Sequence, residues 1–208
     1  MKKILATITI LFIFKKIVRF YIKSWLKASI KNLKKGQTMT TLQAYGLIEG
    51  LERLQIELAV DKIVLICSWG ANPLKLRENL LEIAAAESAM GTARDKTPNS
   101  GAGVWQMDFN TFEDIKKWIE AKKSIEYIAA TGSLIKNCTY QDLMVDLDKA
   151  CFFTRAFLYA RVKGAIGETR EERAKQWKKY YNTIYGKGTE QHYLNMSNKF
   201  YKEVNNGI

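Results

Sequence analysis

The feature that most limits what this chain can fold into is the run of helix signals that covers almost everything from Met39 onward. Asn72 followed by Pro73 is typical of a helix start, because the Asn side chain accepts hydrogen bonds from the first free N–H groups and proline has no N–H to leave unpaired. Only residues 92–107, rich in Gly, Thr, Pro and Asn, indicate an extended or hairpin-like connection. The sequence therefore predicts an α+β fold that is predominantly α-helical, with one small β-hairpin.

Capping residues and apolar periodicity predict further helices. Thr169 and Glu172 form a capping box, in which each side chain bonds the other residue's backbone N–H. Thr189 is the expected cap of the last helix. The predicted segments begin at Thr40 or Thr41 and cover, further along the chain, residues 109–131, 139–162, 168–183 and 188–204.

The basic residues are concentrated in an N-terminal arm, residues 1–38. The arm contains ten Lys and Arg and no Asp or Glu, out of 33 basic residues in the whole protein. From Met39 onward, 23 basic residues stand against 21 acidic ones, so the net charge of +12 belongs mainly to the arm. A nucleic-acid-binding domain carries its basic surface on the fold itself. We therefore expect no nucleic-acid partner.

The arm has the pattern of a weak membrane anchor. Residues 4–14 are apolar apart from two threonines, but a bilayer-spanning helix needs ~20 apolar residues, and no small-residue cleavage site of a signal peptide follows. The pattern of residues 17–33 predicts a basic amphipathic helix suited to an anionic membrane surface. Two interpretations stay open: an arm associated with the inner membrane, or a translation start at Met39 that leaves the arm out. The predicted folded domain is residues 39–208.

The residue types available for chemistry favour carboxylates. Cys67, Cys138 and Cys151 are odd in number and widely spaced, so they match neither a disulfide framework nor a zinc motif, and we expect buried thiols. The one histidine, His192, is expected to be a solvated surface residue, which leaves little for a Ser-His-Asp or Cys-His nucleophile. No metal site and no cofactor are predicted.

Glu87 stands at the end of a small, apolar helical run, EIAAAES, directly before the irregular connection. A carboxyl group at the tip of a buried helix, facing a cleft, is partly desolvated, and desolvation raises its pKa. A raised pKa lets a carboxyl hold its proton near neutrality, as a general acid must. Gly101 and Gly103 allow a ligand or another backbone to approach closely, and Gln106 offers a donor and an acceptor for a sugar amide or a catalytic water.

These residues resemble a known signature. Glu87-Ser88, followed by Gly103-Val104-Trp105-Gln106, is similar to the Glu-Ser … Gly-x-x-Gln signature of lysozyme-like lytic transglycosylases, which goose-type lysozymes share. The segment ERAKQWKKYYNTIYGKGT resembles one found in phage-encoded members of this superfamily, and the resemblance covers most of residues 75–190. It implies a lysozyme-like fold with a small β-hairpin beside the catalytic helix.

The function that the resemblance implies is cleavage of the β-1,4 bond between N-acetylmuramic acid and N-acetylglucosamine in peptidoglycan glycan strands, with Glu87 as the single general acid and base. A lytic transglycosylase closes the muramic 6-hydroxyl on the anomeric carbon, whereas a lysozyme uses water, and both outcomes stay open. Asp95 and Asp108 are candidates for the second carboxylate that many glycosidases use. The implied setting is a phage endolysin or virion enzyme acting at the cell envelope or periplasm. The alternative is a catalytically silent wall-binding or virion structural protein with the same fold.

The other candidate substrate-binding residues each have a structural alternative. Ser88 contacts the sugar or only begins a turn, and Trp105 stacks on a sugar ring or packs in the core. Tyr181 and Asn182 resemble the Tyr-Asn pair of transglycosylases, whose tyrosine lines the cleft, although Asn is also a common helix cap. Tyr159, on an apolar helical segment, belongs either to the cleft or to the core. Gly103 and Gln106 complete the predicted substrate-binding set.

Overall fold

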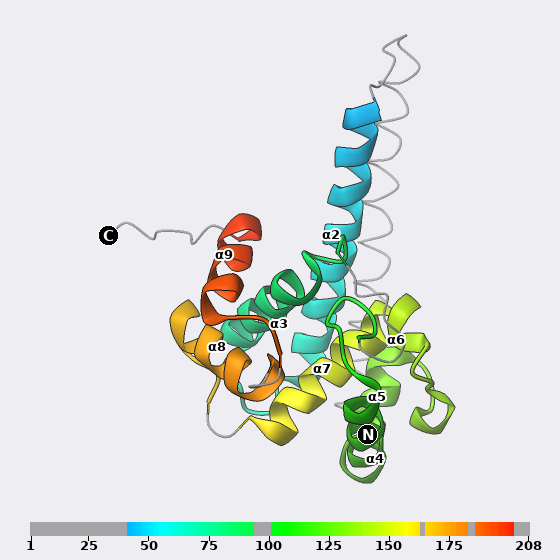
Figure 1. Ribbon diagram of the computed structural model, residues 1–208. Helices are drawn as coiled ribbons and strands as arrows, with labels where there is room; N and C mark the ends of the chain where they lie inside the picture. The colour runs from blue at the N-terminus through cyan, green and yellow to red at the C-terminus, as the bar shows by residue number, and fades with distance from the viewer. Residues whose placement is uncertain (1–40, 94–100, 163–164, 183–185, 202–208) are drawn as a thin grey trace. The chain divides into compact units, whose positions relative to one another are not determined.

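The computed structural model describes residues 41–93, 101–162, 165–182 and 186–201 (Figure 1). The chain divides into two compact units, Met1–Ile48 and Glu49–Ile208. The predicted arm lies outside the described residues, as does Asp95. The second unit holds all the other candidate residues, and its architecture decides whether they meet.

The described residues are predominantly helical, as predicted. Among them, no helix combines the length and apolarity that crossing a membrane requires. The elements, in chain order, are α2 (Thr41–Cys67), α3 (Pro73–Ser88), α4 (Phe109–Lys122), α5 (Ser124–Thr131), the 3-10 helix η1 (Ile135–Asn137), α6 (Asp142–Val145), α7 (Leu147–Arg161), α8 (Arg170–Gln176), the π-helix η2 (Trp177–Asn182) and α9 (Glu190–Phe200).

The predicted helix starts are confirmed by their capping contacts. The Asn72 side chain accepts a hydrogen bond from the Leu74 N–H at 3.0 Å, and Pro73 is the first residue of α3. Thr169 and Glu172 form the reciprocal capping box at the start of α8. These caps depend on residues only two or three positions apart, which is why the sequence predicts them correctly.

The helical segment predicted over residues 109–131 is confirmed, but it consists of two helices because the chain breaks at Lys123. This residue has φ −140° and ψ 21°, and it separates α4 from α5. In an uninterrupted helix the charged Lys123 and Glu126 would follow Ile119 on the buried face. The break lets Tyr127, which is fully buried, enter the core instead.

The helix predicted over residues 139–162 is also interrupted. Asp146 has φ −113° and ψ 101°, so α6 ends before it and α7 begins after it. The Asp146 side chain then accepts a hydrogen bond from the Lys149 N–H at 3.1 Å and caps α7. The same residue thus breaks one helix and starts the next, which apolar periodicity alone does not reveal.

Helix α3 forms much of the core of the second unit. It packs against α7 and α9, and α8 and α9 pack against each other (Figure 1). Its residues from Leu80 to Ala86 are all buried, as expected of a helix covered on every side. The three cysteines are buried free thiols, as predicted.

The predicted hairpin over residues 92–107 is described only in part, because residues 94–100 lie outside the described ranges. Ala102 and Met107 form an isolated antiparallel bridge, with N···O distances of 2.8 and 3.2 Å. Gly103 (φ 69°) and Gln106 (φ 50°) make the tight turn between them. The full β-hairpin therefore stays a prediction.

Candidate active site

Glu87 lies in the last turn of α3, one residue before the helix ends. Ala89 (φ 47°), Met90 (φ 56°) and Gly91 (φ 87°) follow in the left-handed region and turn the chain sharply away from the helix. A left-handed conformation costs a non-glycine residue about 1–2 kcal/mol, and such strained residues often lie at functional sites. The strain here sits directly beside the candidate acid.

The Glu87 carboxyl group is half-buried, and the indole Nε1 of Trp177 donates a hydrogen bond to its Oε1 at 2.7 Å. Burial raises the pKa of this carboxyl from 4.5 to about 7, even though the Trp177 N–H stabilises the charged form and so lowers the pKa. A carboxyl with a pKa of about 7 is roughly half protonated at neutral pH. Such a group can both donate and accept a proton.

The turn at residues 101–107 is fastened to α3 by two hydrogen bonds. Ser88 Oγ donates to the Val104 carbonyl at 2.6 Å, and Trp105 Nε1 donates to the Leu80 carbonyl at 2.8 Å. Both side chains are only 1% exposed. The structure therefore corrects the expectation that Ser88 and Trp105 contact a sugar, because both are interior residues that hold the turn in place.

Gly103 and Gln106 shape this turn from within. A Cβ on Gly103 would lie 2.1 Å from the Leu143 carbonyl oxygen. Glycine is therefore needed here because the backbone at Leu143, and not a ligand, packs against it. The Gln106 side-chain amide donates a hydrogen bond to the Gly103 carbonyl, and a Cβ on Gly101 would lie 2.7 Å from its Oε1. Gln106 is half-buried, so its side chain is held by its own turn without being fully enclosed.

The π-helix η2 brings two more aromatic side chains to this end of α3. Trp177 contacts Glu87, and the Tyr181 hydroxyl donates to the Trp105 carbonyl at 2.6 Å. Asn182 is half-buried and accepts a hydrogen bond from within η2. π-helical turns are rare and are frequently found at functional sites. This one fixes both Trp177 and Tyr181 near the end of α3.

Tyr181 lies within electrostatic reach of Glu87. The pKa of its phenol is raised well above its usual range, first by burial and second by the charge of Glu87. The phenol therefore stays protonated near neutral pH and donates to the Trp105 carbonyl. The structure thus brings together Glu87, Tyr181 and the Gln106 turn, and their contact with a sugar stays a prediction.

Tyr159 lies elsewhere, and its assignment to the same site is corrected. It is 46% exposed on α7, and its ring packs against Trp69 and Trp118 at centroid distances of 5.2 and 6.0 Å. It lines a pocket that also includes Asn72, at the start of α3. Glu87 is in the last turn of that helix, about 20 Å along its axis at 1.5 Å per residue.

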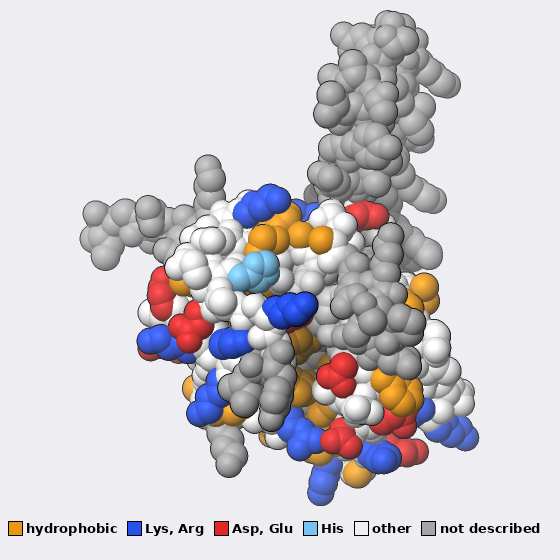
Figure 2. Space-filling view, viewed as in Figure 1, with side chains coloured by type: hydrophobic (Ala, Val, Ile, Leu, Met, Phe, Trp, Pro, Cys, Tyr) orange, Lys and Arg blue, Asp and Glu red, His pale blue; other side chains and the backbone are white. Residues whose placement is uncertain are grey.

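Two neighbours of Glu87 are absent from the set of site residues that the sequence predicts. Trp177 lies in the segment ERAKQWKKYYNTIYGKGT, which carries part of the family resemblance. This resemblance is the one sequence signal that could have indicated Trp177 as a site residue. His192 is exposed at the surface, as expected (Figure 2), but its Nε2 lies 2.9 Å from the Ala86 carbonyl oxygen and its ring centroid 6.4 Å from that of Trp177. No local pattern indicates this contact, because 106 positions separate His192 from Ala86.

Asp108, the second-carboxylate candidate among the described residues, acts electrostatically on the same Tyr181 phenol as Glu87 does, and its carboxylate is used as a helix cap. Asp108 caps α4, accepting hydrogen bonds from the backbone N–H and the hydroxyl of Thr111 at 2.8 and 2.7 Å. Among the described residues, no group of three or more His, Cys, Asp or Glu has the arrangement of a metal site. The chemistry that the raised pKa of Glu87 supports is proton transfer by its carboxyl group.

A buried ionic cluster around Glu82 joins the helices that carry the site residues. Glu82, 1% exposed, accepts hydrogen bonds from Arg170 Nε at 2.9 Å, Arg173 Nε at 2.7 Å and the Tyr193 hydroxyl at 2.9 Å. These contacts join α3 to α8 and α9. Because α8 continues directly into η2, the Glu82 cluster also fixes the position of Trp177.

Comparison of the chain with protein-family models, with curated proteins and with solved structures finds no match. The function is therefore inferred from the geometry around Glu87 and from the motif resemblance in the sequence.

Replacing Trp177 by phenylalanine is expected to raise the pKa of Glu87 further above 7, by about one to two pH units, since a hydrogen bond to a charged group contributes about 1.5–3 kcal/mol. The variant keeps an aromatic ring in a buried position but removes the N–H that stabilises the carboxylate. The carbon-13 shift of the Glu87 carboxyl, followed by NMR against pH, measures the change. Trp118→Phe, at a half-buried tryptophan of α4, is the control and should leave this pKa unchanged. A pKa that falls in the Trp177 variant would contradict the assigned hydrogen bond.

Proposed function

We propose that the protein cleaves the β-1,4 bond between N-acetylmuramic acid and N-acetylglucosamine in peptidoglycan, with Glu87 as the single general acid and base of a lysozyme-like α+β domain. The observation that carries this proposal is the half-buried carboxyl group at the end of α3, whose pKa burial raises to about 7. A single carboxyl that must first donate and then accept a proton works best when its pKa lies close to the working pH.

The proposed reaction uses the two protonation states of Glu87 in turn. The protonated carboxyl donates its proton to the glycosidic oxygen as the bond from that oxygen to the anomeric carbon breaks. The resulting carboxylate then removes a proton from the muramic 6-hydroxyl as this oxygen bonds to the anomeric carbon, which leaves a 1,6-anhydro end. If water is the acceptor, the carboxylate removes a proton from water and the product has a reducing end. Both routes return Glu87 to its protonated form.

The neighbouring residues have supporting roles in this proposal. Trp177 orients the carboxyl group through the 2.7 Å hydrogen bond and stabilises it when it is charged. Gln106 contacts the acetamido group or the attacking oxygen, and Tyr181 and Asn182 line the sugar-binding side of η2. Gly103 acts indirectly, by letting the turn pack against the Leu143 carbonyl. The proposed setting is the cell envelope, periplasm or a phage virion, with the arm attached to an anionic membrane surface.

The direct test is incubation of the purified protein with purified peptidoglycan and mass spectrometry of the released fragments. We expect soluble muropeptides with 1,6-anhydro ends, each lighter by one water than the hydrolytic product. Hydrolytic products would keep Glu87 as the acid and make the enzyme a lysozyme. Sedimentation with the wall and no release of fragments at any pH would reject cleavage and favour the catalytically silent wall-binding protein.

The rate of wall cleavage is expected to fall as the pH rises through about 7. Glu87 must be protonated when the glycosidic bond breaks, and its pKa of about 7 means that each further pH unit removes most of the remaining acid form. Initial rates of fragment release, measured at several pH values across the neutral range, test this decrease. A rate that keeps rising well above this pKa would exclude Glu87 as the proton donor.

A further inference from the structure

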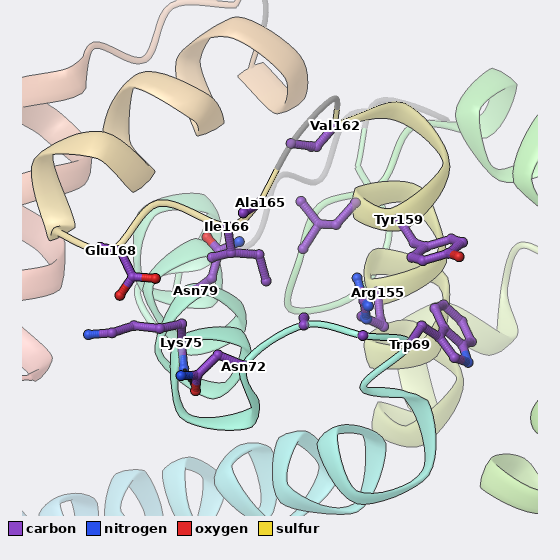
Figure 3. A pocket seen from close by; sticks show the side chains of 13 residues that line it. Trp69, Asn72, Lys75, Asn79, Arg155, Tyr159, Val162, Ala165, Ile166 and Glu168 are labelled. Carbon is purple, nitrogen blue, oxygen red and sulfur yellow. Dashed lines mark hydrogen bonds between the residues drawn. The ribbon is translucent and has the colours of Figure 1, made fainter.

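A pocket of about 240 Å³ lies at the opposite end of α3 from Glu87 (Figure 3). One side is formed by Trp69, which follows α2, and by Arg155 and Tyr159 of α7; the other side is formed by the first turns of α3, including Lys75. Val162, Ala165 and Ile166, which follow α7, complete it with apolar side chains. Its volume is below the ~300 Å³ at which pockets for drug-sized ligands begin. A ligand here would have to be small.

Arg155 is the unusual residue of this pocket, because it is a charged side chain that is only 3% exposed. Its Nε donates to the Cys67 carbonyl at 2.9 Å and its Nη2 to the Ser68 carbonyl at 2.6 Å, at the end of α2. Its guanidinium carbon lies 4.9 Å from the centroid of the Trp69 ring and 5.3 Å from that of Tyr159. The helix end and the two rings offset part of the positive charge.

Within the described ranges, no Asp or Glu forms an ion pair with Arg155. The contrast with Arg170 and Arg173 is direct, since both of those buried arginines bond to Glu82. Burial without a carboxylate partner lowers the pKa of the Arg155 guanidinium to about 10. A guanidinium has five N–H donors, and the two bonds to backbone carbonyls leave its terminal N–H pair for another acceptor.

The remaining charges of the pocket lie at its rim. Lys75 Nζ pairs with Glu78 at 3.3 Å, outside the pocket lining, and Glu168 is exposed on the connection before α8. The apolar side chains of Leu158, Val162 and Ile166 line the space between these charges. The pocket therefore offers one desolvated cation, a second cation at the rim that is paired with Glu78, an apolar wall, and the amide side chains of Asn72 and Asn79.

We propose that this pocket binds a small monocarboxylate with a short apolar body, such as an N-acylated amino acid or the C-terminal residue of a peptide. The carboxylate lies against the terminal N–H pair of Arg155, a geometry in which guanidinium and carboxylate form two parallel hydrogen bonds. The apolar body lies against Leu158, Val162 and Ile166. A monoanion fits better than a phosphate dianion, because the acidic Glu168 stands at the rim and Arg155 has only one free edge.

The test uses the full-length, nitrogen-15-labelled protein and N-acetyl-alanine as the probe. We expect saturable NMR shifts of the Trp69 indole N–H, with a dissociation constant on the order of 1 mM, as for a ligand held by one ion pair and little apolar area. N-acetyl-alanine methylamide, which is neutral, and inorganic phosphate should each bind at least about tenfold more weakly. N-acetyl-alanyl-alanine tests whether the pocket accepts a peptide terminus. If it does, this dipeptide should bind at least as tightly as N-acetyl-alanine.

Variants separate binding from folding. Arg155 also caps α2, so its removal can unfold the protein, whereas Lys75→Glu changes the charge of the rim at a half-buried side chain. We expect Lys75→Glu to weaken binding of N-acetyl-alanine severalfold, and the same charge change at the exposed Lys117 of α4 to have no effect on binding. Equal binding of the acid and its methylamide, equal binding of phosphate, or shifts that map away from Trp69 would each overturn the proposal. None of these results would bear on Glu87, about 20 Å away along α3.

Discussion

Glu87→Gln is expected to lower the rate of peptidoglycan cleavage by about 10²–10⁴-fold while the protein stays folded. Glutamine has the same shape and keeps an oxygen that can accept the Trp177 hydrogen bond, which is 2.7 Å long in the wild type. It has no proton to donate to the glycosidic oxygen at any pH at which the protein is folded. The initial rate of fragment release from purified peptidoglycan, compared at equal protein concentration, measures the loss.

The same variant has an expected signature in stability that does not depend on the substrate. The folded-state pKa of Glu87, about 7, lies above its unfolded value of 4.5, so the folded state holds the proton to higher pH. The stability that this proton contributes is fully present below pH 4.5 and is lost as the pH rises through about 7. The glutamine side chain of the variant cannot lose a proton. The free energy of unfolding of the variant, relative to that of the wild type, should therefore increase with pH, by at most about 3 kcal/mol at pH 8 and by almost nothing at pH 4. Urea unfolding at the two pH values measures the difference.

Glu120→Gln, at an exposed glutamate of α4, is the matched control and should change neither cleavage nor the pH dependence of stability. Cleavage at the wild-type rate by the Glu87 variant would remove Glu87 from the mechanism. Loss of cleavage with no pH-dependent gain in stability would keep Glu87 in the site but contradict its raised pKa.

The local part of the site could be predicted from the sequence, because its causes are local. Asn72 and Pro73 fix the start of α3, and the small apolar residues before Glu87 predict that the helix is buried up to its tip. Burial of that tip is also the reason for the raised pKa. The step from residue pattern to helix, and from helix to desolvated carboxyl, needs no knowledge of distant segments.

The contacts that complete the site could not be predicted in this way. The Trp177 indole meets Glu87 across 90 positions of the chain, and its reach depends on a π-helical turn that no composition rule predicts. Ser88 and Trp105 have residue types that suit either a sugar contact or the core, and only their buried carbonyl acceptors decide between the two. The assignment of Tyr159 to the site is wrong for a similar reason, since an aromatic residue on an apolar helix does not reveal which end of a neighbouring helix it faces.

Glu82→Gln is expected to destabilise the protein by about 3–5 kcal/mol, because it removes the buried carboxylate that Arg170 and Arg173 share. Arg170, 7% exposed, would lose the carboxylate that its Nε contacts at 2.9 Å. Arg173 would keep Glu78, at 3.1 Å, which is partly exposed to solvent. The expected loss is a large fraction of the ~5–15 kcal/mol that typical domains have, and urea unfolding at neutral pH measures it. Glu171→Gln, at an exposed residue of α8, is the control and should change stability by less than about 0.5 kcal/mol.

A combined variant separates the unpaired charges from the loss of packing. Replacing Glu82, Arg170 and Arg173 together by apolar residues of similar volume removes every charge of the cluster, and such replacements are often neutral or stabilising. We expect the triple variant to recover most of the stability that Glu82→Gln loses. Because the cluster joins α3 to α8 and so positions Trp177, the Glu82 variant should also change the pKa of Glu87, whereas a cluster that only stabilises the fold would leave that pKa near 7. A loss of less than about 1 kcal/mol in Glu82→Gln would show that solvent reaches the arginines and that the cluster does not hold the site.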